Sequence, residues 1–333
     1  MWTLGRAGLG AVLHVAGQLG LGGFVTYCLY SVACTLLLGA AWACSAPPLA
    51  IGRHILPFTG ARLVREAASD ILPFSQIGGL VVGVRILIAR GLPGPLVNAS
   101  VVVDLTTEMA GQVVFTLFGI GGFVMLRSGG GAALMTPILI GTGLMIVLMV
   151  AFFAAQRWAL GLAQALLGRV MPAVGSGIGD VGVALSRIYA RRWRVVGALA
   201  FNLAGWVASA AGAWIVLALM DERLPLINVL VIESLIFVLR SVAFAIPGAL
   251  GVQEAAYMLL GPLLGLPPAA ALALSLAKRA RDLAIGVPAL ISWQLGETHA
   301  WRRAKIVRDA TLGLAAASPH NMRDTFVSGE KSR

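Results

Sequence analysis

The sequence has little of what catalysis and metal binding require. Its 333 residues include only three Cys and four His. None of them lies in a Cys-x-x-Cys or His-Glu-x-x-His pattern, which are spacings typical of zinc sites, and no Ser/His/Asp set is visible. We therefore expect no catalytic residue, no metal ion and no other cofactor, and we predict that the protein is not an enzyme.

Charged residues are also scarce. They make up 12% of the chain, whereas 59% of the residues are hydrophobic, and a typical soluble domain has about 25% charged residues. The apolar residues come in runs of about 20 rather than in alternating segments of about 10, which favours membrane helices over an outer-membrane barrel. The composition thus predicts an all-α fold, a polytopic integral membrane helical bundle.

Lys is rare among the basic residues, since Arg supplies all but three of the 25 and the net charge is +11. The Arg residues flank apolar runs, as the positive-inside rule and attraction to an anionic leaflet require, so we expect no nucleic-acid partner. The segments 50–70, 157–194 and 302–308 are rich in basic residues. They predict cytoplasmic loops and a cytoplasmic C-terminus, with an amphipathic helix at 176–193 on the inner leaflet.

The apolar runs predict about six full spans and two half-helices. The segments 77–89 and 252–264 would cover only about 20 Å of a hydrocarbon core of about 30 Å, so each is interpreted as a re-entrant or broken half-helix. We predict a membrane domain at 1–308, whose first helix is retained, and a disordered cytoplasmic tail at 309–333. The predicted membrane helices are 20–43, 77–89, 96–126, 134–155, 195–219, 226–246, 252–264 and 269–295.

Both short segments follow a break that contains proline, at Pro73 and at Pro247. Non-helical backbone at membrane depth is tolerated only beside protein or a water-filled cavity, and paired interrupted segments point to a transporter-type site. The two segments share the same order, a break that contains proline followed by a short apolar segment. This order suggests an inverted repeat without establishing one. The helix that begins after Gly251 would offer its positive end to an anion such as a lipid phosphate.

Two pairs of ionisable residues lie inside apolar runs. Asp104 and Glu108 share a helix face. They form a proton or cation relay, or pair with arginines inside the membrane such as Arg85, or belong to a buried ion pair that only ties helices together. Glu233 and Arg240 also share a face. Arg240 either holds a phosphate in two-point geometry or pairs with a carboxylate.

A third cluster, residues 278–282, lies within the run 269–295. Each charge at the bilayer centre costs about 2.5–3.5 kcal/mol, so these residues line a cavity, pair with one another or mark a turn at the interface. We predict headgroup contacts for one set of residues and a counter-charge or proton-relay role for another. The first set is Arg240, Pro247, Gly248, Gly251, Gln253, Glu254, Lys278, Arg279 and Arg281, and the second is Asp104, Glu108, Glu233 and Asp282.

The run Pro247–Glu254 (PGALGVQE), followed by Leu264-Gly-Leu266 and a small-residue helix with Arg279, resembles the PGGLGxRE region of the lysylphosphatidylglycerol synthase membrane domain, a flippase-like family. Residues 63–79 and 104–108 are similar to its hopanoid-associated branch. The resemblance implies a multi-pass protein of the bacterial inner membrane that moves, or helps to move, a phospholipid or hopanoid between leaflets. An alternative is a non-transporting partner that organises hopanoid synthesis or export.

Some features depart from the family pattern. Gln253 stands where the family usually has Arg, which removes one cation from the expected anion site, and Ala249 replaces a Gly. The soluble aminoacyl-transferase domain of the full-length synthases is lacking, so lysyl transfer is not expected. If residues 50–70 are cytoplasmic, the first helix runs from outside to inside. The family often has one more N-terminal helix, and a truncated start would explain this outside N-terminus.

Overall fold

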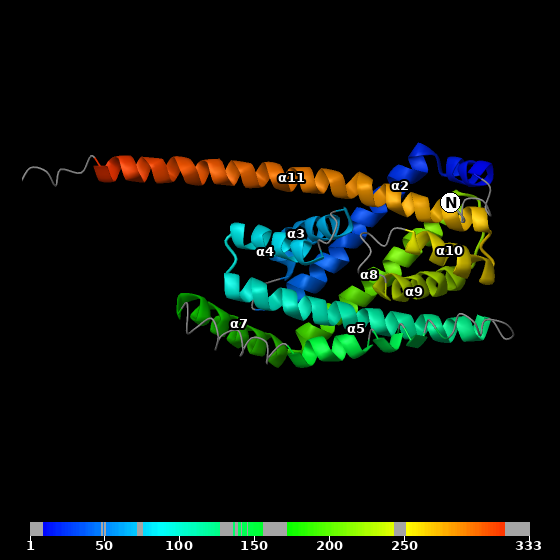
Figure 1. The fold of residues 1–333 in the computed structure, drawn as a ribbon, viewed down its shortest axis with the longest axis horizontal. Helices are drawn as coiled ribbons and strands as arrows, with labels where there is room; N and C mark the ends of the chain where they lie inside the picture. The colour runs from blue at the N-terminus through cyan, green and yellow to red at the C-terminus, as the bar shows by residue number, and fades with distance from the viewer. Residues whose placement is uncertain are drawn as a thin grey trace, which may run out of the picture. The chain divides into compact units, whose positions relative to one another are not determined.

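A computed structural model describes most of the chain. The residues it describes are 9–47, 49, 51–71, 76–126, 136, 139–140, 142–144, 146–155, 172–242 and 251–316. All regular structure in these residues is helical, which confirms the predicted all-α fold. The elements are α2 (Leu9–Cys44), α3 (Ile51–Ile71), α4 (Gln76–Ala89), α5 (Gly94–Leu126), α7 (Pro172–Ala190), α8 (Arg192–Leu219), α9 (Leu226–Val242), α10 (Val252–Leu263) and α11 (Pro268–Ala316) (Figure 1).

Three of these helices, within the described part of the chain, are long and apolar enough to cross a membrane: α2 over Val12–Cys44, α5 and α8. Shorter apolar helices occur at Gly78–Ala89 and Leu226–Leu239. The described residues therefore contain fewer uniformly apolar full spans than the six predicted. The segment predicted at 269–295 lies in α11, which carries the charged residues Lys278, Arg279, Arg281 and Asp282.

Helix α3 is the main correction to the predicted organisation. Residues 50–70 were predicted as a cytoplasmic loop, but Ile51–Ile71 form a helix that packs on α2 and lies beside α4 (Figure 1). Phe58 and Ala61 are fully buried in that packing. The helix has too many charged residues to be recognised as a membrane segment from the sequence. The sequence does not reveal that several of these charges are paired inside the bundle.

The C-terminal boundary also differs from the prediction. Helix α11 continues to Ala316, beyond the predicted start of a tail at residue 309. The chain divides into two compact units, Met1–Val287 and Pro288–Arg333. Every residue of the cavity described below belongs to the first unit.

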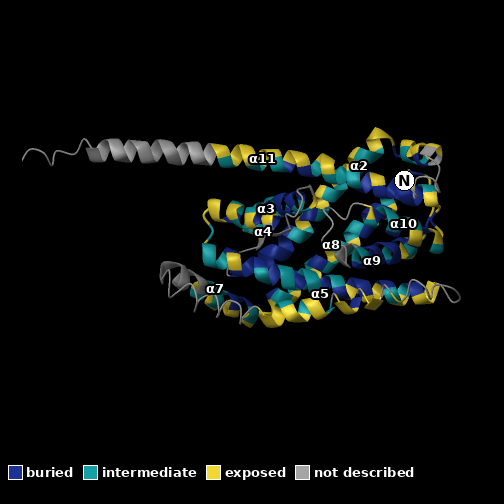
Figure 2. Cartoon of the chain, viewed as in Figure 1, coloured by how far each residue is buried: buried dark blue, intermediate teal, exposed yellow. Residues whose placement is uncertain are grey.

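Helix α5 has one exposed apolar face and one buried face. Val114, Leu117, Phe118 and Met125 are exposed on one side, whereas Phe115 and other residues three or four positions apart are buried (Figure 2). That spacing places each set on one helix face. Large exposed apolar side chains in such numbers are typical of a surface that contacts lipid.

Close approach of α5 and α9 depends on glycine. A Cβ on Gly119 would overlap the Ser234 hydroxyl and lie 2.8 Å from Ser234 Cβ, whereas a Cβ on Gly121 of the same helix would meet nothing within 4 Å. Small residues of this kind allow membrane helices to pack backbone to backbone.

Gly119→Ala is therefore expected to destabilise the protein by about 1–3 kcal/mol, the usual cost of overpacking. Gly121→Ala, the matched control, is expected to be neutral or to stabilise α5 by up to about 1 kcal/mol, because alanine favours helix more than glycine does. Thermal unfolding of the purified protein in detergent measures both. Equal midpoints for the two variants would contradict the tight contact.

Candidate functional site

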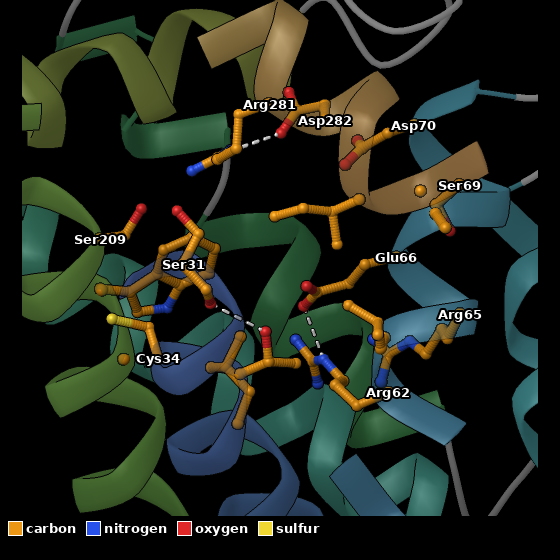
Figure 3. Close-up of a pocket in the computed structure, with 18 of the residues that line it drawn as sticks. Ser31, Cys34, Arg62, Arg65, Glu66, Ser69, Asp70, Ser209, Arg281 and Asp282 are labelled. Atoms are coloured by element: carbon orange, nitrogen blue, oxygen red, sulfur yellow. Dashed lines mark hydrogen bonds and ion pairs between the residues drawn. The ribbon is translucent and has the colours of Figure 1, made fainter. Parts of the chain in front are cut away.

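A cavity of about 500 Å³ opens among α2, α3, α5, α8 and α11, with single contributions from α4 and α9. Figure 3 shows polar side chains from α2, α3, α8 and α11 turned towards it. Leu80, Leu105 and Phe237 add apolar surface. The charged residues in its lining are Arg62, Arg65, Glu66, Asp70, Glu108, Lys278, Arg281 and Asp282.

One wall of the cavity is a cluster of five charges on α3 and α5. Arg62 Nη1 and Arg65 Nη1 donate to Asp104 Oδ2 at 2.8 Å each. Their Nη2 atoms donate to the two oxygens of Glu108, at 2.6 and 2.8 Å. Arg62 Nε also donates to Glu66 Oε1 at 2.8 Å. We call these five residues the arginine–carboxylate cluster.

Helical spacing assembles this cluster. Arg62, Arg65 and Glu66 stand three and four residues apart on α3, and Asp104 and Glu108 stand four apart on α5, so each set projects from one face. Two guanidinium forks of one helix therefore meet two carboxylates of the other. Helix α4 supports α3 here, since a Cβ on Gly79 would lie 2.5 Å from the backbone oxygen of Arg65.

Burial makes the cluster depend on its pairing. Arg62 and Asp104 are exposed to 1% and 0%, and Arg65 to 6%. Charges removed from water in this way are tolerated only when each is paired and hydrogen-bonded. The sequence suggested Arg85 as an example of a partner for Asp104 and Glu108, but the structure pairs them with Arg62 and Arg65.

A second cluster joins α9, α10 and α11. Lys278 Nζ donates to Glu233 Oε2 at 2.5 Å and to Tyr257 Oη at 2.9 Å, and Tyr257 Oη donates to Glu233 Oε1. Glu233 and Tyr257 are almost fully buried. Lys278 also lines the cavity, so this lysine–glutamate–tyrosine cluster connects the cavity to the interior of the bundle.

Two further pairs follow Lys278 along α11. Arg281 Nη2 donates to Asp282 Oδ1 at 2.5 Å and Arg281 Nη1 to Tyr27 Oη at 3.0 Å, and the guanidinium also lies over the Tyr27 ring. Figure 3 shows the Arg281–Asp282 pair at the cavity. Arg279 Nη2 lies 3.3 Å from Glu254 Oε1, and neither residue lines the cavity.

At the start of α10 a side chain of the helix itself accepts a backbone hydrogen bond. Gly251 has a positive φ of 81°, and its N–H donates to Glu254 Oε2 at 2.8 Å. The carboxylate thus accepts one backbone N–H at the helix N-terminus, where the sequence predicted a lipid phosphate. Gln253 is buried and donates to Ser275 Oγ at 3.2 Å. Gly251, Gln253 and Glu254 are not among the residues that line the cavity.

The structure brings together only part of the predicted site. Glu108, Lys278, Arg281 and Asp282 line one cavity. Asp104 and Glu233 are buried and do not line it, and they accept hydrogen bonds from lining residues, Asp104 from Arg62 and Arg65 and Glu233 from Lys278. Pro247 and Gly248 lie outside the described residues, as does the Arg240 side chain.

Sequence reasoning missed the contribution of α3, namely Arg62, Arg65, Glu66 and Asp70. A signal was present in the spacing of Arg62, Arg65 and Glu66, which complements that of Asp104 and Glu108. The basic residues of the segment 50–70 favour a cytoplasmic loop by the positive-inside rule, and a loop has no helical faces on which this spacing would matter.

Comparison with known protein families finds a match. The family model described as lysylphosphatidylglycerol synthase TM region matches residues 1–289. No curated protein and no solved structure matches the chain. The match is to the family as a whole and gives no evidence for the hopanoid-associated branch. Since this family model covers nearly the whole chain, the protein is a multi-pass membrane protein that belongs to the lysylphosphatidylglycerol synthase TM region family, which is flippase-like.

Proposed function

We propose that this protein moves a membrane lipid, a phospholipid or a hopanoid, between the leaflets of the bacterial inner membrane without altering it chemically. Its C-terminus would lie in the cytoplasm. The observation that carries the proposal is the charged cavity of about 500 Å³ inside a helical membrane bundle.

The outer surface of the bundle supports this proposal. Leu21, Leu29 and Val196 are exposed to 80%, 66% and 62%, as expected of side chains that face lipid tails. Charged groups inside a membrane face cavities or one another and mark the paths of substrates. A headgroup in the cavity would therefore exchange water for polar side chains while its tails stay in the bilayer.

The cavity offers both kinds of hydrogen-bonding group. Lys278, Arg281 and Arg65 would donate to phosphate or hydroxyl oxygens of the headgroup. Glu66 and Asp70 would accept hydrogen bonds from hydroxyl or amino groups. Because each cation already has a carboxylate partner, the headgroup would compete with these pairs rather than fill an empty anion site.

A second candidate is a non-transporting membrane partner that organises hopanoid synthesis or export machinery. It is favoured by the exposed residues Arg187, Arg191, Arg192 and Trp193, the last exposed to 69%, at the junction of α7 and α8. Such a surface suits a protein or anionic-leaflet contact. On this reading, substitutions at the junction would abolish function, and neutral substitutions in the cavity would not.

The test is transbilayer movement of fluorescent phospholipid and hopanoid analogues in vesicles that contain the purified protein. Ser209 lines the cavity from α8 (Figure 3), so Ser209→Phe is expected to fill the space and reduce movement to the rate of empty vesicles. Val207→Phe adds a phenyl ring to the exposed side of the same helix, where Val207 is 42% exposed, and is expected to behave like wild type.

Two outcomes would overturn the proposal. In the first, wild-type vesicles match protein-free vesicles for every lipid. In the second, Ser209→Phe and Val207→Phe slow the movement equally, which would mean that the cavity is not the route.

A further inference from the structure

We propose that the arginine–carboxylate cluster holds one exchangeable proton on Asp104, so that the state of the cavity depends on proton binding. The link between this proton and lipid movement rests on the proposed function. The proton site itself rests on charge, burial and hydrogen bonding within the cluster.

The charges of the cluster do not balance. Arg62 and Arg65 supply two positive charges, and Glu66, Asp104 and Glu108 supply three negative charges, which leaves one negative charge in excess. An unbalanced charge inside a membrane protein is costly, and uptake of a proton is the ordinary way to remove it.

The hydrogen bonds indicate which carboxylate takes the proton. Both oxygens of Glu108 accept from guanidinium groups, and Glu66 is the most exposed member, at 37% of its side chain. Asp104 is 0% exposed and receives both of its guanidinium bonds on Oδ2. Among the described residues, no donor reaches its Oδ1. A buried carboxylate oxygen without a donor favours the neutral acid.

Among the described residues, the charged groups that line the cavity from neighbouring parts of the bundle add no net positive charge to the cluster. The other charged groups facing the cavity are Asp70 of α3 and Lys278, Arg281 and Asp282 of α11, which sum to zero. Glu233 of α9 lies behind Lys278 and adds another negative charge. Other titratable groups nearby are Tyr30 and Cys34 of α2, which line the cavity, and Tyr189 of α7, which reaches Thr106.

The cavity gives the proton on Asp104 a route of exchange, and it couples proton binding to the entry of a lipid headgroup. Glu66 and Glu108 line it and contact the same guanidinium group as Asp104, so a proton moves between them without crossing apolar surface. Loss of the proton adds one negative charge to the wall. A headgroup phosphate then enters less readily, whereas proton binding favours its entry.

Infrared spectroscopy of the purified full-length protein tests the site without any lipid assay. Wild type is expected to show a protonated carboxyl band at neutral pH that is lost at alkaline pH. Asp104→Asn removes the proton site and leaves two charges of each sign, so the band is expected to vanish. Glu108→Gln also balances the cluster and is expected to abolish it. Asp282→Asn, in the same cavity but another pair, is expected to keep it.

A pH series in the vesicle assay tests the coupling. Movement of a phosphate-bearing lipid is expected to rise about tenfold from mildly alkaline to mildly acidic pH, as a unit charge roughly 10 Å away at an effective dielectric of about 20 requires. Asp104→Asn is expected to move lipid at a rate independent of pH.

The outcomes are separable. Lipid movement without any carboxyl band that depends on Asp104 would overturn the proton site and leave the transport function standing. A band that vanishes in Asp104→Asn, in a protein that moves no lipid, would support the proton site and overturn the function. A band with pH-independent movement would overturn the coupling alone.

Discussion

Arg62→Gln is expected to destabilise the protein by about 3–5 kcal/mol, the cost of removing one partner from a buried ion pair. Arg62 donates to three carboxylates, those of Glu66, Asp104 and Glu108. Its loss leaves Arg65 as the guanidinium of a cluster with three acidic side chains. Because long side chains of this cluster join α3 to α5, we expect the link between the two helices to weaken as well.

The matched control is Arg53→Gln, the same substitution on the same helix at an exposed residue. It is expected to change stability by no more than about 0.5 kcal/mol. The midpoint of thermal or detergent-induced unfolding measures both variants. Adding Glu108→Gln to Arg62→Gln removes one surplus negative charge, so the double variant is expected to be more stable than Arg62→Gln alone. If Arg62→Gln unfolds at the same midpoint as Arg53→Gln, the cluster does not hold α3 against α5.

Lys278→Met is expected to have an effect of similar size, again about 3–5 kcal/mol. Lys278 is the cation that faces Glu233, which is exposed to only 1%. Without it, Glu233 keeps one hydrogen bond among the described residues, from Tyr257, and either carries an unpaired charge or takes up a proton. Both are costly in the interior of the bundle.

Arg279→Met is the control, since Arg279 is the next residue of α11 and its pair with Glu254 is longer, at 3.3 Å, and more exposed. We expect a clearly smaller loss. The double variant Lys278→Met with Glu233→Gln, which leaves no unpaired charge in this cluster, should recover part of the stability. Recovery measured in a double-mutant cycle separates the pair from general disruption, and no recovery at all would argue against the pair.

The charged residues inside apolar runs could be recognised from the sequence because a bilayer penalises them individually. Asp104, Glu233 and Lys278 were singled out on that ground, and each is buried in a charged cluster. Arg62 and Arg65 cannot be recognised in this way, because they lie on α3, which is not a long apolar run. A search for charged residues within long apolar runs cannot find a partner that lies on a helix with many polar residues, such as α3.

The Pro247–Glu254 segment shows a different limit. Its composition correctly predicted that a helix begins at Val252, because Gly251 adopts a positive φ that glycine tolerates. Its composition also suggested an open anion site, but Glu254 of the same helix accepts the Gly251 N–H. Whether a helix end is free or capped depends on the rotamer of one side chain, which local sequence does not specify.

The sequence by itself determined that this is an all-α, multi-pass membrane protein with costly charges at named positions, because hydropathy and run length act locally along the chain. Only the tertiary structure decided which charges meet and where the cavity lies. Arg62 contacts Asp104 across 42 positions of the chain, and Arg281 contacts Tyr27 across 254. Such pairings arise from the packing of whole helices, and that packing depends on the faces of several elements at once.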